Sequence, residues 1–234
     1  MNIKARYALS YRGALTVTGA ATALLIAAAW GCGSSSSTSG GGGGGLPNSK
    51  ANLTQVEHGR YLVTTVGCAD CHAGGVNDPS SATWLAGYVG AAGGSGPGAF
   101  NIGPFHTYAK NLTPDMNTGI GMHSDRQIYN ALRYGLAPDS TPDVVITSTT
   151  PGVGNFPAAP VYLAPPMPWT SFRHLSDTDI WSIVAYIKHG VKAVSNTVPD
   201  SQSPPGGWAS SYTSAKVGPD QLATYPAANE QFAP

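Results

Sequence analysis

Apolar residues recur at intervals of three and four positions in three separate stretches of the chain, and this spacing predicts three packed helices. The predicted helices cover residues 52–66, 124–135 and 176–192. The second and third begin at Ser124 and Ser176, each followed three positions later by a polar side chain that can complete an N-terminal cap. Between the helices the chain is rich in glycine and proline, which predicts long irregular connections.

The start of the chain has a different pattern, with basic residues followed by an uncharged apolar run from residue 13 to residue 31. This order predicts an export signal over residues 1–31. The Gly31-Cys32 step resembles the lipid-attachment box of bacterial lipoproteins, so we expect lipidation of Cys32, with an uncleaved membrane span or ordinary signal cleavage as alternatives. Residues 32–50 are expected to form a flexible tether rich in glycine and serine. Each alternative places the remaining chain outside the cytoplasmic membrane.

The composition excludes two classes of protein, nucleic-acid binders and disulfide-rich scaffolds. The 234 residues include only 12 basic and 12 acidic side chains, so there is no positive excess to neutralise the phosphates of a nucleic acid. Three cysteines are too few for a scaffold held together by disulfides. The 30 glycines and 19 prolines exceed average usage and agree with the expectation of long loops. These counts indicate a loop-rich, weakly charged protein with no nucleic-acid partner.

Two of the cysteines lie in the motif Cys68-Ala69-Asp70-Cys71-His72. Thiols three positions apart are one helical turn from each other, so both can form thioethers with the two vinyl groups of one haem. A thioredoxin-like pair would need a preceding strand and a following helix, whereas a helical pattern precedes this motif and two glycines follow it soon after. A zinc site would need two further ligands. The motif therefore predicts haem c, attached covalently at Cys68 and Cys71 and bound at the iron by His72.

The second axial ligand of the iron is predicted to be Met167, because a thioether is a soft donor that raises the reduction potential. Three nearby prolines fix the local backbone, so an irregular loop can hold the sulfur of Met167 in place. We expect Met116 and Met122 to pack at the haem edge or to be exposed. His106 and His123 are the alternative ligands if Met167 is not one.

Residues 79–109 contain no charged side chain but five aromatic ones. We favour an irregular wrap that keeps water away from the porphyrin over the alternative of a flexible, glycine-rich insertion. Asn111 and Thr113 follow this stretch, and their side chains can either donate hydrogen bonds near a haem propionate or cap a local turn. The sequence does not separate these two roles.

Three blocks of the chain carry a resemblance to a known family. They are residues 56–72, which contain the cysteine motif, residues 111–135, which begin NLTPD, and residues 167–187, which begin MPW. The blocks resemble class I cytochrome c domains in the electron-transfer subunits of membrane-bound gluconate and alcohol dehydrogenases. This resemblance implies an all-α, mono-haem class I cytochrome c fold with few helices and long irregular loops over residues 51–195.

The same resemblance implies that the first and third helices cross, with Gly59 allowing close approach to Ile183 and Tyr186. Members of this family often carry three haems, whereas this chain has a single C-x-x-C-H motif. Aromatic residues within 196–234 predict an irregular C-terminal tail that packs on the domain.

These expectations describe an electron carrier rather than an enzyme. We expect one haem to pass one electron at a time between redox partners, such as a dehydrogenase, another cytochrome or a terminal oxidase. The export signal predicts a membrane-tethered bacterial lipoprotein on the periplasmic side. Two alternatives stay open, which are a cytochrome subunit of a larger dehydrogenase complex and a haem enzyme or sensor with a labile sixth ligand.

Overall fold

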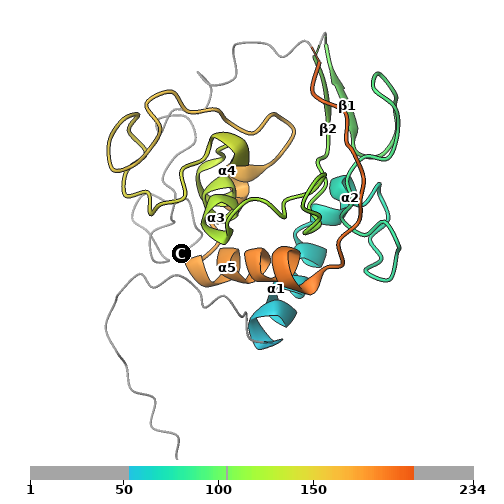
Figure 1. Cartoon of the computed structure of the whole chain (residues 1–234), viewed down its shortest axis with the longest axis horizontal. Coiled ribbons are helices and arrows are strands. Elements are labelled where there is room, and N and C mark those ends of the chain that lie inside the picture. The colour runs from blue at the N-terminus through green and yellow to red at the C-terminus, as the bar shows by residue number, and fades with distance from the viewer. Residues whose placement is uncertain (1–52, 104, 203–234) are drawn as a thin grey trace, which may run out of the picture. The chain divides into compact units, whose positions relative to one another are not determined.

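The computed structural model describes residues 53–103 and 105–202 (Figure 1). The predicted export signal, the lipidation site Cys32 and the tether therefore lie outside the described residues, as does the predicted tail beyond residue 202. Within the described ranges, no helix is both long and apolar enough to cross a membrane. The domain limits expected from the sequence stay predictions.

Five α-helices and one two-stranded sheet form most of the regular structure in the described residues (Figure 1). In chain order the elements are α1 (Leu53–Thr65), α2 (Cys68–His72), β1 (Ala99–Ile102), β2 (Phe105–Tyr108), α3 (Asp125–Tyr134), the 3₁₀ turn η1 (Pro138–Ser140), α4 (Trp169–Phe172), α5 (Asp177–Ala185) and the π turn η2 (Tyr186–Gly190). Long, mostly irregular connections join α2 to β1 and α3 to α4. Few helices and long loops agree with the expected fold, whereas the pair of strands corrects the all-α expectation.

The two strands lie inside the uncharged stretch and form an antiparallel hairpin. Ala99 pairs with Tyr108, and Ile102 pairs with Phe105. Phe105 and Tyr108 are buried, and the ring of Tyr108 stacks on that of Tyr88 with 5.0 Å between the ring centroids. Strands of four residues are too short to stand alone and depend on packing against the rest of the molecule. The local sequence pattern therefore did not predict them.

Residues 194–202 run alongside this hairpin, as the red-orange segment in Figure 1 shows. Gln202 exchanges two backbone hydrogen bonds with His106 of β2, at 3.0 and 2.8 Å. Further back, the side-chain amide of Asn196 donates to the carbonyl oxygens of Ala86 at 2.7 Å and Tyr88 at 2.9 Å. The segment thus fastens both the loop before the hairpin and the hairpin itself.

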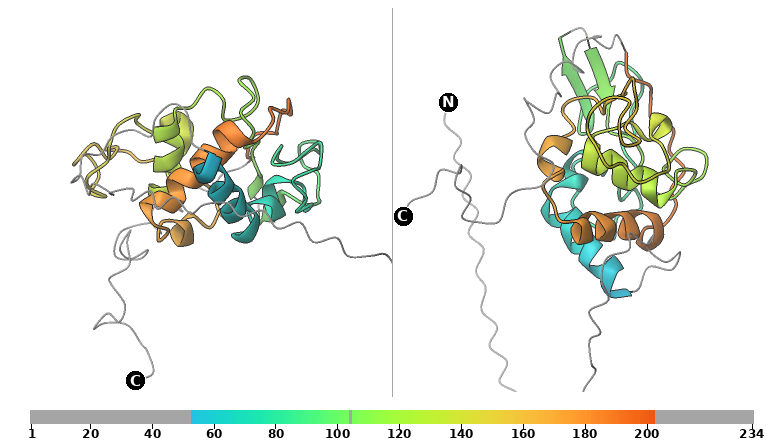
Figure 2. Two further views of the ribbon diagram at one scale, coloured as in Figure 1. Left: turned by 90° about the horizontal axis from the view of Figure 1, so that it is seen from below. Right: turned by 90° about the vertical axis from the view of Figure 1, so that its left-hand side faces the viewer.

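Helices α1 and α5 cross, as the blue and orange ribbons in Figure 2 show. Gly59 of α1 lies at the crossing, where a Cβ atom would overlap the carbonyl oxygen of Ser182 and come within 2.7 Å of Tyr186 Cβ. The close approach expected at Gly59 is present, and it is made to Tyr186 as predicted. On the other side the contact is with the Ser182 backbone rather than with Ile183.

Gly59→Ala is therefore expected to destabilise the fold by about 1–3 kcal/mol, the usual cost of forcing an extra carbon into a packed core. The alanine would gain helix propensity, so the loss would come from the crossing alone. The midpoint of urea unfolding measures the effect. Glu57→Ala, at an exposed position of the same helix, is the control and should leave the midpoint nearly unchanged. Equal midpoints for the two variants would contradict a tight crossing at Gly59.

Helices α3 and α5 begin at the predicted caps. The Ser124 hydroxyl accepts a hydrogen bond from the Gln127 amide at 3.1 Å, and the Gln127 side chain accepts one from the Ser124 amide at 2.9 Å. The predicted capping box is confirmed.

Helix α5 ends at Ala185, earlier than predicted, and the chain continues in the wider π turn η2. In that turn the Lys188 ammonium donates to three carbonyl oxygens of the loop before α3, those of Ile120, Gly121 and His123.

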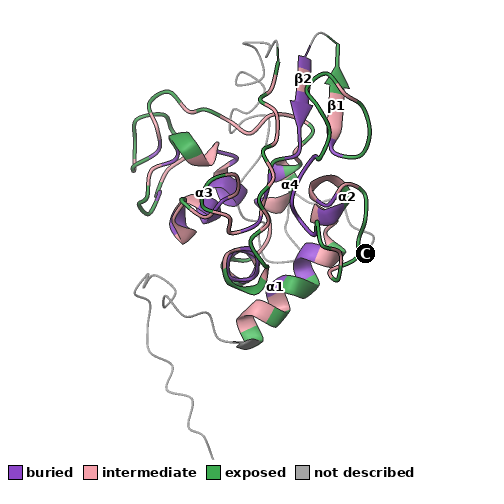
Figure 3. Cartoon of the chain, turned by 45° about the vertical axis from the view of Figure 1, so that its right-hand side comes forward, coloured by how far each residue is buried: buried purple, intermediate pink, exposed green. Residues whose placement is uncertain are grey.

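The buried side chains form two separate apolar clusters. The main cluster draws on α1, α2, α3, α5, η2 and the uncharged stretch, and its most buried members include Val63, Ala69, Leu85 and Ile180. Figure 3 shows buried residues on α3, β2 and one side of α1. A second, smaller cluster lies in the long connection after α3 and consists of Leu136, Ile146 and Phe156, with Tyr134 and Tyr162 packed against them.

Candidate functional site

The cysteine motif forms the short helix α2, which follows α1 after a sharp turn. Gly67 makes this turn with a positive φ of 78°, a conformation that favours glycine. Ala69 is completely buried in the main cluster and anchors α2 there. Cys68 and Cys71 occupy the first and fourth positions of α2, and neither is in a disulfide. Both thiols are thus presented from one turn of helix.

Both cysteines are held as thiols rather than thiolates. Burial raises the pKa of Cys68 to about 12. Burial also raises the pKa of Cys71, and the negative charge of Asp70 adds to the effect. The protonated thiol is the form that adds to a vinyl group with its own proton.

The imidazole of His72 has a fixed orientation. Its Nδ1 lies 2.7 Å from the carbonyl oxygen of Lys110, which can only accept a hydrogen bond, so Nδ1 carries the proton. Nε2 is then the unprotonated nitrogen with a lone pair for a metal. Burial lowers the pKa of His72, which favours the neutral ring that binds iron. Lys110 lies two residues after the end of β2, so the hairpin places this acceptor.

Met167 lies in the irregular segment before α4. It is half-buried and packs against the main apolar cluster, and Cys68 also packs against that cluster. The Met167 amide donates to the Ala164 carbonyl at 3.1 Å, which makes a tight turn of the segment. Met116 and Met122 are 58% and 76% exposed. Of the three methionines in the described ranges, only Met167 packs against the main apolar cluster, to which Ala69 of the cysteine motif belongs.

The two alternative histidine ligands lie in other surroundings. His123 has its Nε2 3.3 Å from a carboxylate oxygen of Asp139, which gives it a surface ion-pair partner when protonated. His106 lies on β2, and its backbone pairs with Gln202. Its Nδ1 is buried and has no hydrogen-bond partner within the described ranges.

Asn111 and Thr113 use their side chains within the protein. Asn111 Oδ1 accepts hydrogen bonds from the Thr113 amide at 2.9 Å and the Thr113 hydroxyl at 2.7 Å. Asn111 Nδ2 donates to the Val194 carbonyl at 2.8 Å and to the Thr118 hydroxyl at 3.2 Å. These contacts fit the turn-capping role, and a role at a haem propionate stays a prediction.

Two parts of the uncharged stretch, residues 84–88 and most of residues 105–109, are buried against the rest of the domain. Trp84 and Leu85 belong to the main cluster, and the Trp84 indole donates to the hydroxyl of Tyr186 at 2.9 Å. Leu112, just beyond the hairpin, donates its amide to the Leu85 carbonyl at 2.9 Å. These two parts have the packing expected of a wrap, whereas most of residues 89–97 are exposed.

The chemistry of these donors fits a haem. Paired thiols, one neutral imidazole and one thioether are the groups that attach and ligate haem c. A metal held by the protein alone would need more ligands, and the described residues contain no cluster of three or more histidine, cysteine or acidic side chains that could supply them. A porphyrin brings four nitrogen ligands of its own, so it needs only two more, the number that His72 and Met167 are predicted to supply.

Relatives of the chain are found among cytochrome subunits of dehydrogenases. Over 188 residues, 79% of the chain, it is 30% identical to the gluconate 2-dehydrogenase cytochrome c subunit of Pantoea cypripedii. It is also 30% identical to the fructose dehydrogenase cytochrome subunit of Gluconobacter japonicus over 156 residues, 67% of the chain. The identity is again 30% to the cytochrome c subunit of the quinone alcohol dehydrogenase of Gluconobacter oxydans, over 151 residues or 64% of the chain.

The matched stretches cover 35%, 25% and 24% of these relatives, so the chain spans about a third or less of their length. No model of a protein family matches the chain. The resemblance inferred from the three sequence blocks is confirmed by these relatives.

Proposed function

We propose that this chain, a relative of the cytochrome c subunits of gluconate, fructose and alcohol dehydrogenases, is a single-haem electron-transfer protein. Cys68 and Cys71 hold the haem through thioethers, and His72 and Met167 are the axial ligands. The haem supplies an Fe(III)/Fe(II) couple that exchanges one electron at a time. The observation that carries the proposal is the 2.7 Å hydrogen bond from His72 to Lys110, because it directs the unprotonated Nε2 toward a metal.

The protein's own residues hold and shield this group. Cys68 and Cys71 would hold the haem covalently, each thiol adding across one vinyl group so that the sulfur would bond to one carbon and the proton would go to the other. The apolar cluster beside α2 and the uncharged stretch exclude water, and a dry surrounding is one of the factors that set a haem potential. No described side chain is assigned a catalytic step, since electron transfer needs only a held haem and an accessible edge.

The partners are proposed from the relatives. Those proteins are subunits of dehydrogenases that act on gluconate, fructose or alcohols, so we propose that this chain accepts electrons from a dehydrogenase. It would pass them to another cytochrome or to a terminal oxidase. The chain has one C-x-x-C-H motif, which supports one electron-transfer step per chain. It acts as a separate carrier or as a non-catalytic subunit of a larger complex.

The place of action is proposed from the start of the chain. Haem c is joined to its protein outside the cytoplasm, and the apolar run before Cys32 is a signal for export. Lipidation of Cys32 would then tether the domain to a membrane on the periplasmic side through residues 33–50. Mass spectrometry of the native protein checks this point, because a diacylated Cys32 as the new N-terminus is the expected product.

A redox titration of the purified holoprotein tests the function. The expected results are one covalently bound haem per chain and a single transition whose Nernst slope corresponds to one electron. A pull-down from the native membrane should recover a dehydrogenase catalytic subunit with the protein. Absence of covalent haem in protein made with intact haem-attachment machinery would reject the proposal, and so would a haem that cannot be reduced reversibly.

A further inference from the structure

We propose that Gly135 and Arg133, at the C-terminal end of α3, are positioning residues for the sixth iron ligand. The inference rests on the proposed ligation of the iron by Met167 and deepens it. The segment that carries Met167 is about 30 residues after α3 in the sequence, yet its flanking residues contact the C-terminal end of this helix. These contacts determine where the thioether can lie.

Both ends of the short Met167 loop meet at Gly135. At its start, the Leu163 amide donates to the Gly135 carbonyl oxygen at 2.7 Å. At its end, the ring of Trp169 lies so close to Gly135 that a Cβ atom there would overlap the indole. Trp169 is only 1% exposed, so the ring has no room to move away. Residues 164–168, with Met167 among them, therefore form a loop that leaves from and returns to one residue.

Gly135 meets two independent requirements for glycine. It caps α3 with a φ of 70°, and its amide donates to the Ala131 carbonyl at 2.9 Å. A side chain at this backbone conformation is strained wherever it occurs. The contact with Trp169 adds a second restriction, which not every positive-φ glycine in the described residues has. Gly152, for example, has a φ of 77°, but a Cβ atom there would meet only Ala158 Cβ, at 3.7 Å.

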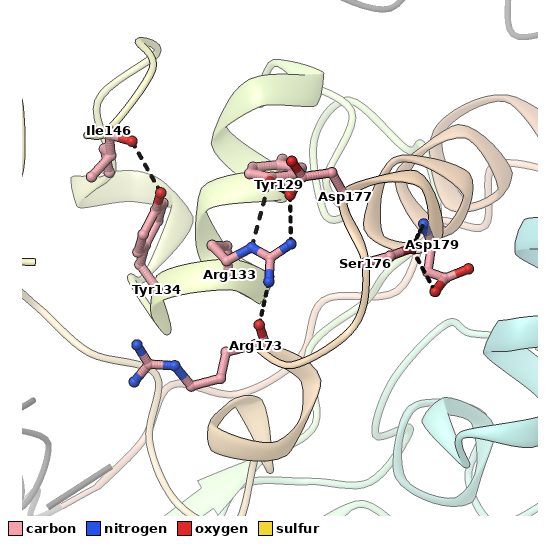
Figure 4. A network of polar contacts seen from close by, with 8 residues as sticks. All are labelled: Tyr129, Arg133, Tyr134, Ile146, Arg173, Ser176, Asp177 and Asp179. Carbon is pink, nitrogen blue, oxygen red and sulfur yellow. Dashed lines mark hydrogen bonds and ion pairs between the residues drawn. The ribbon is translucent and has the colours of Figure 1, made fainter. Parts of the chain in front are cut away.

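Arg133 holds the chain that follows the Met167 loop, as Figure 4 shows. Its guanidinium donates to the carbonyl oxygen of Arg173, just after α4. It also donates to a carboxylate oxygen of Asp177 at 2.6 Å, at the start of α5. Tyr129 donates to the same oxygen at 2.5 Å. Arg133 is 1% exposed, so its bond to the Arg173 carbonyl is shielded from water, whereas the Asp177 side chain that accepts the other bonds is 60% exposed.

The smaller apolar cluster supports the same loop from its other side. The Tyr162 ring packs against that cluster and stacks on Trp169 with ring centroids 5.8 Å apart and planes 8° apart. The long connection after α3 is thus packed against the residues that flank Met167. Loosening Gly135 should free the loop between Leu163 and Trp169, and Met167 should then leave the iron more readily.

The experiment measures how fast imidazole replaces the methionine in the oxidised holoprotein. At saturating imidazole the rate reports the opening of the methionine–iron bond. Gly135→Ala is expected to raise this rate about tenfold or more relative to Gly152→Ala, corresponding to about 1.4 kcal/mol. Gly152→Ala is the matched control, because it has the same type of backbone strain without the contact to Trp169. Urea unfolding of both holoproteins separates loop opening from general instability.

The outcomes distinguish this inference from the proposed function. If the wild-type protein lacks the far-red absorbance band of methionine bound to ferric haem, the proposed ligand is wrong and the inference falls with it. If the band is present but both alanine variants open at equal rates, only the inference is overturned. Should Gly135→Ala not fold, Arg133→Lys takes its place, since it keeps the charge but loses the forked donor group. A rate for Arg133→Lys equal to that of the wild type would likewise overturn the inference.

Discussion

Replacing Cys68 and Cys71 together with serine is expected to give a chain with no covalently bound haem. Serine hydroxyls do not add to vinyl groups under the conditions in which thiols do, so both attachment points are lost. His72 and Met167 could still hold haem reversibly, but denaturing electrophoresis would remove it. Haem staining of the denatured chain therefore measures the effect, with complete loss of signal as the expected result.

The remaining cysteine provides a matched control for this change. Cys32→Ser should retain full haem staining, because Cys32 lies outside the motif. The single variants Cys68→Ser and Cys71→Ser should each keep at most one thioether. A vinyl group left unreacted stays conjugated with the porphyrin, so their reduced spectra should shift to longer wavelength. Wild-type staining in the double variant would show that these thiols are not the attachment sites.

Met167→His is expected to lower the reduction potential by about 0.1–0.3 V, within the ~0.8 V range over which axial ligands tune haem. A thioether favours ferrous iron, whereas a second imidazole stabilises the ferric state. The haem should stay attached through Cys68 and Cys71, so the same preparation also shows loss of the far-red band in its oxidised spectrum. Potentiometric titration measures the shift.

Met122→His is the control for this substitution. Met122 is 76% exposed, and its replacement should leave both the potential and the far-red band as in the wild type.

The hypothesis of a labile sixth ligand can be tested on the wild-type protein through carbon monoxide binding. Under that hypothesis the reduced wild-type protein would bind carbon monoxide as readily as Met167→Ala does. Such a result would favour a haem enzyme or sensor over an electron carrier.

The local parts of the fold follow from the sequence because their causes are local. The start of α3 is predictable since Ser124 and Gln127 satisfy each other's backbone amides three positions apart. The thiols of Cys68 and Cys71 share one turn because their spacing matches the helical period. Met167 is half-buried, whereas Met116 and Met122 are exposed, which agrees with the expectation that the proline-rich loop holds Met167 in place.

The remaining parts depend on contacts between residues far apart in the chain. The acceptor for His72 is a backbone carbonyl 38 positions away, and every residue type has such a carbonyl. The hairpin of β1 and β2 is too short to show a clear alternating pattern among so many glycines. Gly135 is recognisable from the sequence as a helix stop, but its contact with Trp169 is not. Nor does the sequence show that Arg133 would meet the carbonyl of Arg173.

The segment of residues 194–202 has a consequence for the order in which the protein matures. It is the last described part of the chain to be synthesised, yet it fastens the loop before the hairpin and the hairpin itself, after which the Lys110 carbonyl accepts the hydrogen bond of His72. It also receives the Asn111 side chain at the Val194 carbonyl. In a chain exported with its N-terminus first, as proposed, the cysteine motif leaves the cytoplasm before this segment does. We therefore expect haem attachment outside the cytoplasm to have its widest access before residues 194–202 pack on the hairpin.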